Sequence, residues 1–311
     1  MWSPWRDWRR VMIQPTMRHK MKNPVGIILV SVLLAWILVR GTISLQPAQS
    51  ESSKSSLATI IDRGSIRCSY LIYAPYFIKD PNTGKFSGFM YEIMEEIGKA
   101  AGLKIDWVEE VNFDNVFANL DARRSDVFCA GLWANAQRAR AATFTQPLMY
   151  AVITAWGRTD ETRFANLREL NSESVRISTI DGAMEDLIAQ TEFSKAKRLS
   201  MVSSTPFSQN FENLVSGKSD ATFVEPSVAI LYLQRNPGTI KQLSGGKALR
   251  AFGNALVVKR GEVELAEFLN VAISELLQRG KIDEILARYE PAPGAFPRVA
   301  LPYQPIELKL P

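Results

Sequence analysis

The sequence contains a single histidine, His19, among its 311 residues. His19 precedes a long apolar run, so the chain after that run has no imidazole for a Ser–His or Cys–His relay or for a histidine-containing metal site. The chain also lacks a Gly-x-Gly-x-x-Gly fingerprint and a phosphate loop ending in Gly-Lys-Ser/Thr. These absences favour a binding protein over an enzyme, although acid–base chemistry by carboxylates stays open. We expect no cofactor and no metal.

The chain has little surplus charge outside its N-terminus. The net charge is +5, yet seven of the 37 Lys and Arg and only one of the 32 Asp and Glu fall within residues 1–40. The remainder therefore carries 30 basic and 31 acidic side chains. A nearly neutral body is a poor phosphate binder, so we expect no nucleic-acid partner.

The longest apolar run extends from Val25 to Val39 and holds no charged side chain. Its length lies between that of a secretory signal and that of a spanning helix, which needs about 20 apolar residues. Because the basic stretch 1–22 precedes it, that stretch should stay cytoplasmic and the rest of the chain should be exported to the periplasm. Segment 23–45 is predicted to be a signal peptide or a membrane anchor, and cleavage after Ser50 stays open.

Cysteine is scarce, with only Cys68 and Cys129. An even count in an exported chain is compatible with a disulfide. Both residues, however, lie in apolar strand-like runs, "IRCSY" and "DVFCAGL", where a small buried side chain is the commoner role. Neighbouring strands also seldom offer the required geometry. We therefore expect two unbridged cysteines, with the disulfide as the alternative.

Short apolar runs alternate with amphipathic segments from Leu57 onward. "SIRCSYLIY", "KIDWVEE" and "DVFCAGL" predict strands, whereas residues 89–101 place apolar side chains at helical spacing before Gly102. A second strand-and-helix cycle follows, and residues 262–289 predict two helices broken at Gly280. This alternation indicates an α/β fold with mostly parallel sheets. Residues 291–311 hold six prolines and predict a surface tail.

The order of these motifs resembles the type-2 periplasmic solute-binding proteins, family 3, the amino-acid-type receptors of ABC transporters. The stretches that carry the resemblance are "GSIRCSYLIYAPYF", "GKFSGFMYEIMEEIGKAAG", "SDVFCAGLWANAQRARAATFTQPLMY", "SDATFVEPSVAILYLQ" and "LQRGKIDEILARYE". The resemblance implies a two-lobed α/β fold with a hinge of two crossing strands, and a permease partner in the inner membrane. The expected organisation is a basic region 1–22, a signal or anchor 23–45, a linker 46–56, lobe 1 at 57–150 and 253–290, lobe 2 at 151–252, and a tail 291–311.

The resemblance also implies a ligand site between the lobes. Arg138 matches the arginine that binds the ligand's α-carboxylate, and a position after a strand end suits that role independently. Arg140 is expected to be a surface charge. Glu225 matches the residue that holds the ligand's ammonium, one methylene longer than the usual aspartate. Further candidates are Gly131, the backbone of Gly182, Ala183 and Met184 at a helix start, and Asp181 as a ligand contact or an N-cap.

Departures from the family pattern point to the type of ligand. Tyr70 stands where many of these receptors have an aspartate, and Trp133 stands where they have a threonine. Tyr70, Tyr73, Tyr76 and Trp133 could stack on a ring or surround a cation. We therefore expect a carboxylate-bearing solute that is flatter or more apolar than glutamine or a basic amino acid.

Two other functions stay open. The first is a periplasmic enzyme resembling cyclohexadienyl dehydratase, with Glu225 or Asp181 as general acid. The second is a membrane-tethered sensory binding domain, although residues 291–311 are too few for an added catalytic module.

Overall fold

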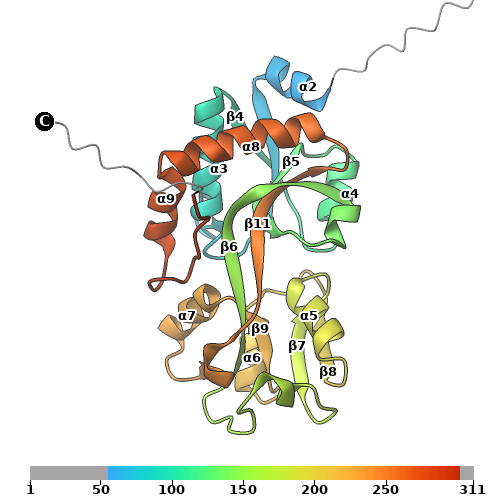
Figure 1. Ribbon diagram of the computed structural model, residues 1–311, viewed down its shortest axis with the longest axis vertical. Coiled ribbons are helices and arrows are strands. Elements are labelled where there is room, and N and C mark those ends of the chain that lie inside the picture. The colour runs from blue at the N-terminus through green and yellow to red at the C-terminus, as the bar shows by residue number, and fades with distance from the viewer. Residues whose placement is uncertain (1–54, 302–311) are drawn as a thin grey trace, which may run out of the picture. The chain divides into compact units, whose positions relative to one another are not determined.

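The computed structural model describes residues 55–301. Within them the chain forms two α/β lobes joined by two long strands, as Figure 1 shows. The expected signal or anchor segment 23–45 and residues 302–311 lie outside the described part. No helix within residues 55–301 is long and apolar enough to cross a membrane.

Lobe 1 is built on three parallel strands in the order β5-β1-β4, with β11 next to β5. Helices cover both faces of this sheet (Figure 1). The elements are α2 (Ser56–Arg63), β1 (Ser65–Tyr70), the β2 (Ile78–Lys79) and β3 (Phe86–Ser87) hairpin, α3 (Phe89–Ala101), β4 (Lys104–Glu110), α4 (Val116–Asp121), β5 (Val127–Trp133), the single-turn helix η1 (Arg138–Arg140), α8 (Val263–Gln278) and α9 (Lys281–Tyr289).

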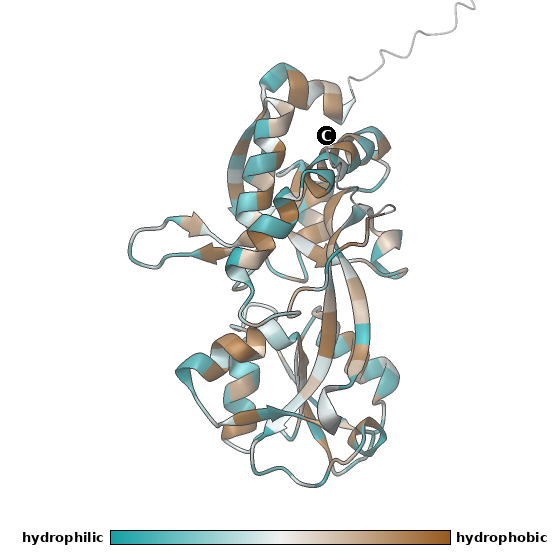
Figure 2. Cartoon of the chain, turned by 60° about the vertical axis from the view of Figure 1, so that its left-hand side comes forward, coloured by the Kyte–Doolittle hydropathy of each residue, from teal (hydrophilic) through white to brown (hydrophobic). Residues whose placement is uncertain are grey.

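Two helix ends confirm the sequence prediction. Helix α3 ends at Gly102, whose φ of 66° is left-handed and whose N–H donates to the carbonyls of Gly98 and Lys99. Gly280 separates α8 from α9 with the same φ. Both positions need a backbone that only glycine adopts without steric cost. The apolar faces of these helices pack on the sheet, and Figure 2 shows the alternation of hydrophobic and hydrophilic residues along them.

Lobe 2 repeats the scheme at a smaller scale. Strands β7 and β8 pair in parallel, and a bridge from Ile177 to Ala221 joins β7 to the residue before β9. The elements are the single-turn helix η2 (Leu167–Leu170), β7 (Arg176–Ile180), α5 (Met184–Glu192), β8 (Lys197–Met201), α6 (Gln209–Val215), β9 (Thr222–Val224), α7 (Pro226–Arg235), β10 (Ile240–Gln242) and the 3-10 turn η3 (Ser244–Gly246).

The connection consists of β6 (Ala142–Arg158) and β11 (Ala248–Lys259), which pair antiparallel along most of their length. Tyr150 pairs with Gly253 and Ile153 pairs with Arg250 in the stretch between the lobes. One hydrophobic core packs around α3 and α8, and a separate one packs around α5 and β9. The expected lobe boundaries at residues 150 and 252 stay predictions.

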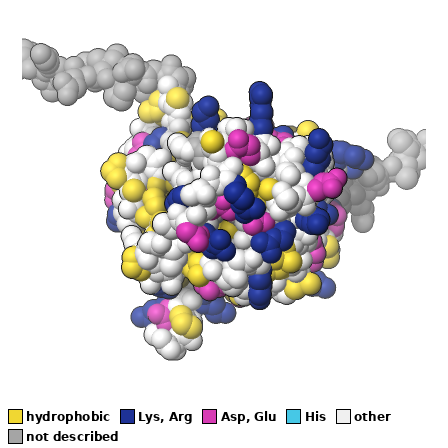
Figure 3. Space-filling model, turned by 90° about the horizontal axis from the view of Figure 1, so that it is seen from below, with side chains coloured by type: hydrophobic (Ala, Val, Ile, Leu, Met, Phe, Trp, Pro, Cys, Tyr) yellow, Lys and Arg dark blue, Asp and Glu magenta, His cyan; other side chains and the backbone are white. Residues whose placement is uncertain are grey.

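The surface of lobe 2 seen in Figure 3 mixes Lys and Arg with Asp and Glu. Several charges in this lobe pair with each other: Arg163 and Arg176 both contact Asp220, at 2.7 and 3.0 Å. Such pairing is typical of a solvated surface and gives no broad basic patch on this face.

Cys68 and Cys129 form a disulfide, so the expectation of two unbridged cysteines is wrong. Strands β1 and β5 are neighbours, and Cys68 pairs with Val127, two residues before Cys129. Side chains two residues apart lie on the same face of a strand, and the two Cα atoms are 5.5 Å apart. That separation lies inside the range that a disulfide requires.

We predict that replacing both cysteines, Cys68→Ala with Cys129→Ala, destabilises the protein by about 2–4 kcal/mol. The disulfide closes a chain separation of 61 residues and thereby restricts the unfolded state. Urea unfolding followed by circular dichroism measures the effect. The wild type under reducing conditions should match the variant, and equal midpoints for the oxidised wild type and the variant would contradict the prediction.

Candidate functional site

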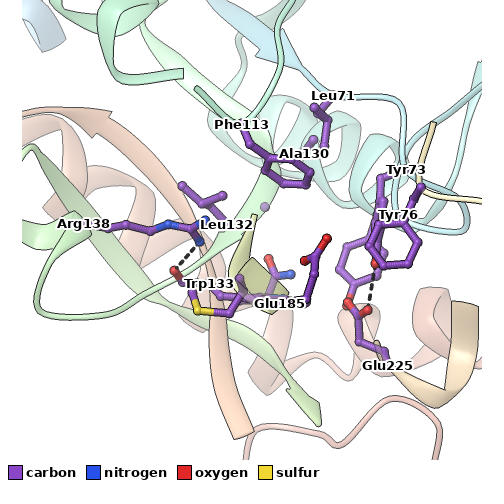
Figure 4. Close-up of a pocket in the computed structure, with 14 residues that line it drawn as sticks. Leu71, Tyr73, Tyr76, Phe113, Ala130, Leu132, Trp133, Arg138, Glu185 and Glu225 are labelled. Atoms are coloured by element: carbon purple, nitrogen blue, oxygen red, sulfur yellow. Dashed lines mark hydrogen bonds between the residues drawn. The ribbon is translucent and has the colours of Figure 1, made fainter. Parts of the chain in front are cut away.

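A small pocket, with a cavity volume of about 30 Å³, lies where the lobes meet. Lobe 1 contributes the segments that follow β1 and β5, and lobe 2 contributes the N-termini of α5 and α7 (Figure 4). Aromatic rings and a few charged groups form most of the wall. The lining residues are Leu71, Tyr73, Tyr76, Phe113, Ala130, Gly131, Leu132, Trp133, Arg138, Met184, Glu185, Phe207, Glu225 and Asn254.

Glu225 joins the two lobes through its carboxyl group. It is the N-cap residue of α7 in lobe 2 and is 1% exposed. Its Oε2 accepts a hydrogen bond of 2.8 Å from the Tyr73 hydroxyl, and its Oε1 accepts one of 3.1 Å from the Tyr76 hydroxyl. Both tyrosines belong to a tight turn of lobe 1 that closes with two backbone hydrogen bonds between Tyr73 and Phe77.

Burial raises the pKa of Glu225 to about 7, and the hydrogen bonds from the two phenols lower it in part. Burial likewise holds the phenol pKa of Tyr73 and of Tyr76 well above 10, so both hydroxyls stay protonated donors. A cation placed beside Glu225 would favour the ionised form. The geometry therefore suits an ammonium group.

Arg138 lies across the pocket from the tyrosines (Figure 4). It begins the turn η1, and its backbone N–H donates to Asn135 Oδ1 at 2.8 Å. Its guanidinium donates to the carbonyl of Trp133 at 3.1 Å and to the carbonyl of Gly182 at 3.0 Å, so it reaches both lobes. Burial lowers its pKa to about 10, so it stays cationic at neutral pH.

The neighbouring residues of β5 complete this wall. Trp133 stacks on Phe252 of β11, with ring centroids 5.6 Å apart and 6° between the ring planes. Gly131 has a φ of 79°, and a Cβ on it would lie 2.0 Å from Asn254 Oδ1. Only glycine therefore leaves room for the Asn254 side chain at the pocket. Arg140 is exposed and does not line the pocket.

Tyr70, expected at the ligand site, does not line the pocket. Its ring is 6% exposed and stacks on Phe77 at a centroid distance of 4.7 Å, inside the core behind the pocket. The register between β1 and β4 shifts between Cys68 and Ser69, and all three residues at the end of β1 are buried. Tyr70 therefore packs in the core, as aromatic residues at strand ends often do.

Asp181, expected as a ligand contact or an N-cap, neither lines the pocket nor caps α5. Its exposed carboxylate accepts a hydrogen bond from Ser200 of β8, and Ala183 is the N-cap of α5. The turn presents the carbonyl of Gly182 to Arg138, and the N–H of Ala183 donates to Ile180. Gly182 and Ala183 line a second hollow, which Arg138 also lines.

The first turn of α5 contains two acids, Glu185 and Asp186. Acids at a helix N-terminus interact favourably with its positive end and compete there with a ligand carboxylate. Of the residues expected at this helix start, Met184 alone lines the pocket.

The sequence prediction missed Glu185, which is 3% exposed and lines the pocket. Burial raises its pKa to about 8. The helical spacing in the sequence indicates this burial, because Glu185 precedes the apolar residues Ile188 and Ala189 by three and four positions and so shares their buried helix face. Phe113, Phe207 and Asn254 were missed because they reach the pocket from distant parts of the chain.

The described residues offer no metal centre: within 55–301 no group of three or more His, Cys, Asp or Glu is arranged to hold an ion. The pocket's polar and aromatic groups include two buried acids, a guanidinium and aromatic walls.

Comparison with known proteins identifies similar chains. Residues 67–292 match the family model of bacterial extracellular solute-binding proteins, family 3. A probable amino-acid ABC transporter-binding protein of Haemophilus influenzae is 23% identical over 68% of this chain and 79% of its own length. The L-arginine-binding protein of Pseudomonas aeruginosa is 26% identical over 70% of this chain and 84% of its own.

A solved structure has the same fold. An ancestral amino-acid-binding protein, described as a precursor of cyclohexadienyl dehydratase, superposes with a TM-score of 0.66 at 22% identity. The match covers 76% of this chain and all of that one. The two-lobed fold expected from the sequence is confirmed.

We predict that the difference in free energy of unfolding between the wild type and Glu225→Gln changes with pH. The folded protein binds a proton on Glu225 more tightly than the unfolded chain does, because the pKa rises from 4.5 to about 7 on burial. This contribution to stability is fully present below pH 4.5 and is lost as the pH rises through about 7. Thermal unfolding at pH 5 to 8 should show the wild type losing stability relative to the variant. A difference that does not change with pH would contradict the prediction, and Glu173→Gln, at an exposed site, is the matched control.

Proposed function

The chain belongs to family 3 of the bacterial extracellular solute-binding proteins, and we propose that it is the receptor of an ABC importer that binds an amino acid between its two lobes. The relatives with amino-acid and L-arginine names support this class of ligand. The protein acts outside the cytoplasm, as its family does. The basic and apolar segments 1–22 and 23–45 support export by a signal or an anchor, and a permease in the inner membrane is the proposed partner.

The observation that carries the proposal is that Arg138 of lobe 1 and Glu225 of lobe 2 line one pocket. A guanidinium has five N–H donors, and two of those of Arg138 reach backbone carbonyls. The other donors can bind the α-carboxylate of an amino acid. A carboxylate has about four acceptor positions, so Glu225 can keep both tyrosine hydrogen bonds and accept the α-ammonium.

Binding in this arrangement couples ligand to conformation. A ligand held by Arg138 and Glu225 contacts both lobes at once, so it favours the conformation in which the lobes are together. The shift is limited by the difference in ligand affinity between the closed and open conformations. The permease then recognises the closed receptor, and the rings of Tyr73, Tyr76 and Trp133 exclude water around the charges.

We predict that Arg138→Ala weakens amino-acid binding by at least about 30-fold, because a charged hydrogen-bonding partner is worth about 2 kcal/mol or more. Isothermal titration calorimetry against the twenty common amino acids measures the change. Arg140→Ala, which removes the same charge from the exposed end of the same turn, should bind like the wild type. Unchanged affinity in Arg138→Ala would reject the carboxylate role.

A second candidate function is an enzyme resembling cyclohexadienyl dehydratase. It is favoured by the buried Glu225, whose pKa of about 7 suits a general acid near neutral pH. Asp181 is not a candidate, because its side chain is exposed and lies outside the pocket.

Incubation with prephenate or arogenate, followed by the absorbance of the aromatic product, tests this candidate. Turnover that is lost in Glu225→Gln would favour the enzyme. We expect no turnover, which leaves the receptor as the function.

A further inference from the structure

Glu185 is a buried acid that the proposed contacts to the α-carboxylate and α-ammonium do not use. It is the second residue of α5, and Figure 4 shows its carboxyl group pointing into the pocket between Arg138 and the two tyrosines. Its Oε1 has no hydrogen-bond partner among the described residues. A buried carboxyl oxygen without a partner costs folding free energy, so such an oxygen in a pocket is a candidate for a ligand contact.

The groups around Glu185 come from several elements. Glu225 of lobe 2 and Asp186, its neighbour on α5, raise its pKa through their charge, after the larger effect of burial. Tyr73 and Arg138 of lobe 1 also interact electrostatically with it. Arg138 lies near enough to interact, but its two described hydrogen bonds go to backbone carbonyls.

A second acceptor without a partner lies in the same pocket. Asn254 of β11 is 1% exposed, and its Oδ1 has no hydrogen-bond donor within residues 55–301. The pocket therefore presents unused acceptors from two elements, the helix α5 and the crossing strand β11. A ligand that supplies N–H donors in addition to an α-ammonium would satisfy them.

Charge balance defines the ligand more closely. With both acids ionised, the pocket carries one positive charge on Arg138 and two negative charges on Glu185 and Glu225. An amino acid with a cationic side chain carries one negative and two positive charges, so it neutralises all three. A neutral amino acid supplies one cationic group fewer, so one of the two acids would have to keep its proton, whereas a basic amino acid lets both acids ionise beside a counter-charge.

We propose that Glu185 binds the cationic side-chain group of the ligand and makes the receptor selective for basic amino acids, a role that rests on the proposed function. The specificity acid comes from α5 of lobe 2, whereas the first strand of lobe 1 carries Tyr70 in the core. The rings of Tyr73 and Phe113 flank the same space and add cation–π attraction (Figure 4). This revises the sequence-based expectation of a flatter or more apolar ligand.

Calorimetry with L-arginine and L-citrulline tests the role of Glu185, because the two amino acids have nearly the same shape and differ in side-chain charge. The wild type should bind arginine at least about tenfold more tightly than citrulline. In Glu185→Gln the affinity for arginine should fall by about tenfold or more, while the affinity for citrulline stays within about threefold. Glu173→Gln, an exposed acid of the same lobe, should leave both affinities as in the wild type.

Two results would overturn the role of Glu185 and leave the proposed function standing. One is Glu185→Gln that keeps the preference for arginine. The other is a wild type that binds citrulline, or any neutral amino acid, at least as tightly as arginine and lysine, with that binding still lost in Arg138→Ala. Binding of no amino acid at all would overturn the proposed function and the role of Glu185 together.

The variant should fold, because glutamine has nearly the shape of glutamate and removes a buried ionisable group. Circular dichroism should show an unchanged spectrum and a melting temperature no lower than that of the wild type. If Glu185→Gln does not fold, two other affinity ratios of arginine to citrulline decide: that of the wild type and that of Glu185→Asp, which keeps the carboxyl group. A ratio of one or less in either protein overturns the role.

Discussion

A carboxyl group of one lobe, held by two phenols of the other, is the contact on which the site depends. Glu225 lies at the N-terminus of α7, and Tyr73 and Tyr76 donate to its two oxygens. A buried carboxyl group must either keep its proton or face a cation. The same group therefore couples the contact between the lobes to the response to pH and, in the proposed function, to the ligand's ammonium group. Glu185 is a second buried acid of the same pocket.

The lobe 1 side of the pocket rests on one pair of strands. Strand β1 leads into the turn with Tyr73 and Tyr76, and β5 leads into the turn with Arg138. The disulfide between Cys68 and Cys129 ties these two strands together below the pocket. The lobe 2 side of the pocket is formed by the N-termini of α5 and α7. The paired strands β6 and β11 connect the two lobes. The groups that line the pocket thus come from two lobes that are connected by paired strands.

Local patterns in the sequence predicted the helices and their glycine ends, and the position of Arg138 after a strand predicted its place at the pocket. Properties that depend on pairing between distant segments were not predictable in this way. The disulfide depends on the register of β1 against β5, and Tyr70 is buried because rings from other segments, Phe77 and Trp107, pack against it. Whether Asp181 or Glu185 reaches the pocket depends on where α5 begins, and it begins after Ala183. The helical spacing of Glu185, Ile188 and Ala189 contained that information, but a capping role for Asp181 was the stronger local pattern.

A crystal structure of the protein with its tightest-binding amino acid tests the central claim most directly. The account predicts the α-carboxylate on Arg138, the α-ammonium on Glu225 and a side-chain cation on Glu185, each at a hydrogen-bond distance of about 3 Å. Tyr73 and Tyr76 should still donate to Glu225, so that the ligand contacts both lobes. A ligand bound outside this pocket, or one that contacts neither Arg138 nor Glu225, would contradict the account.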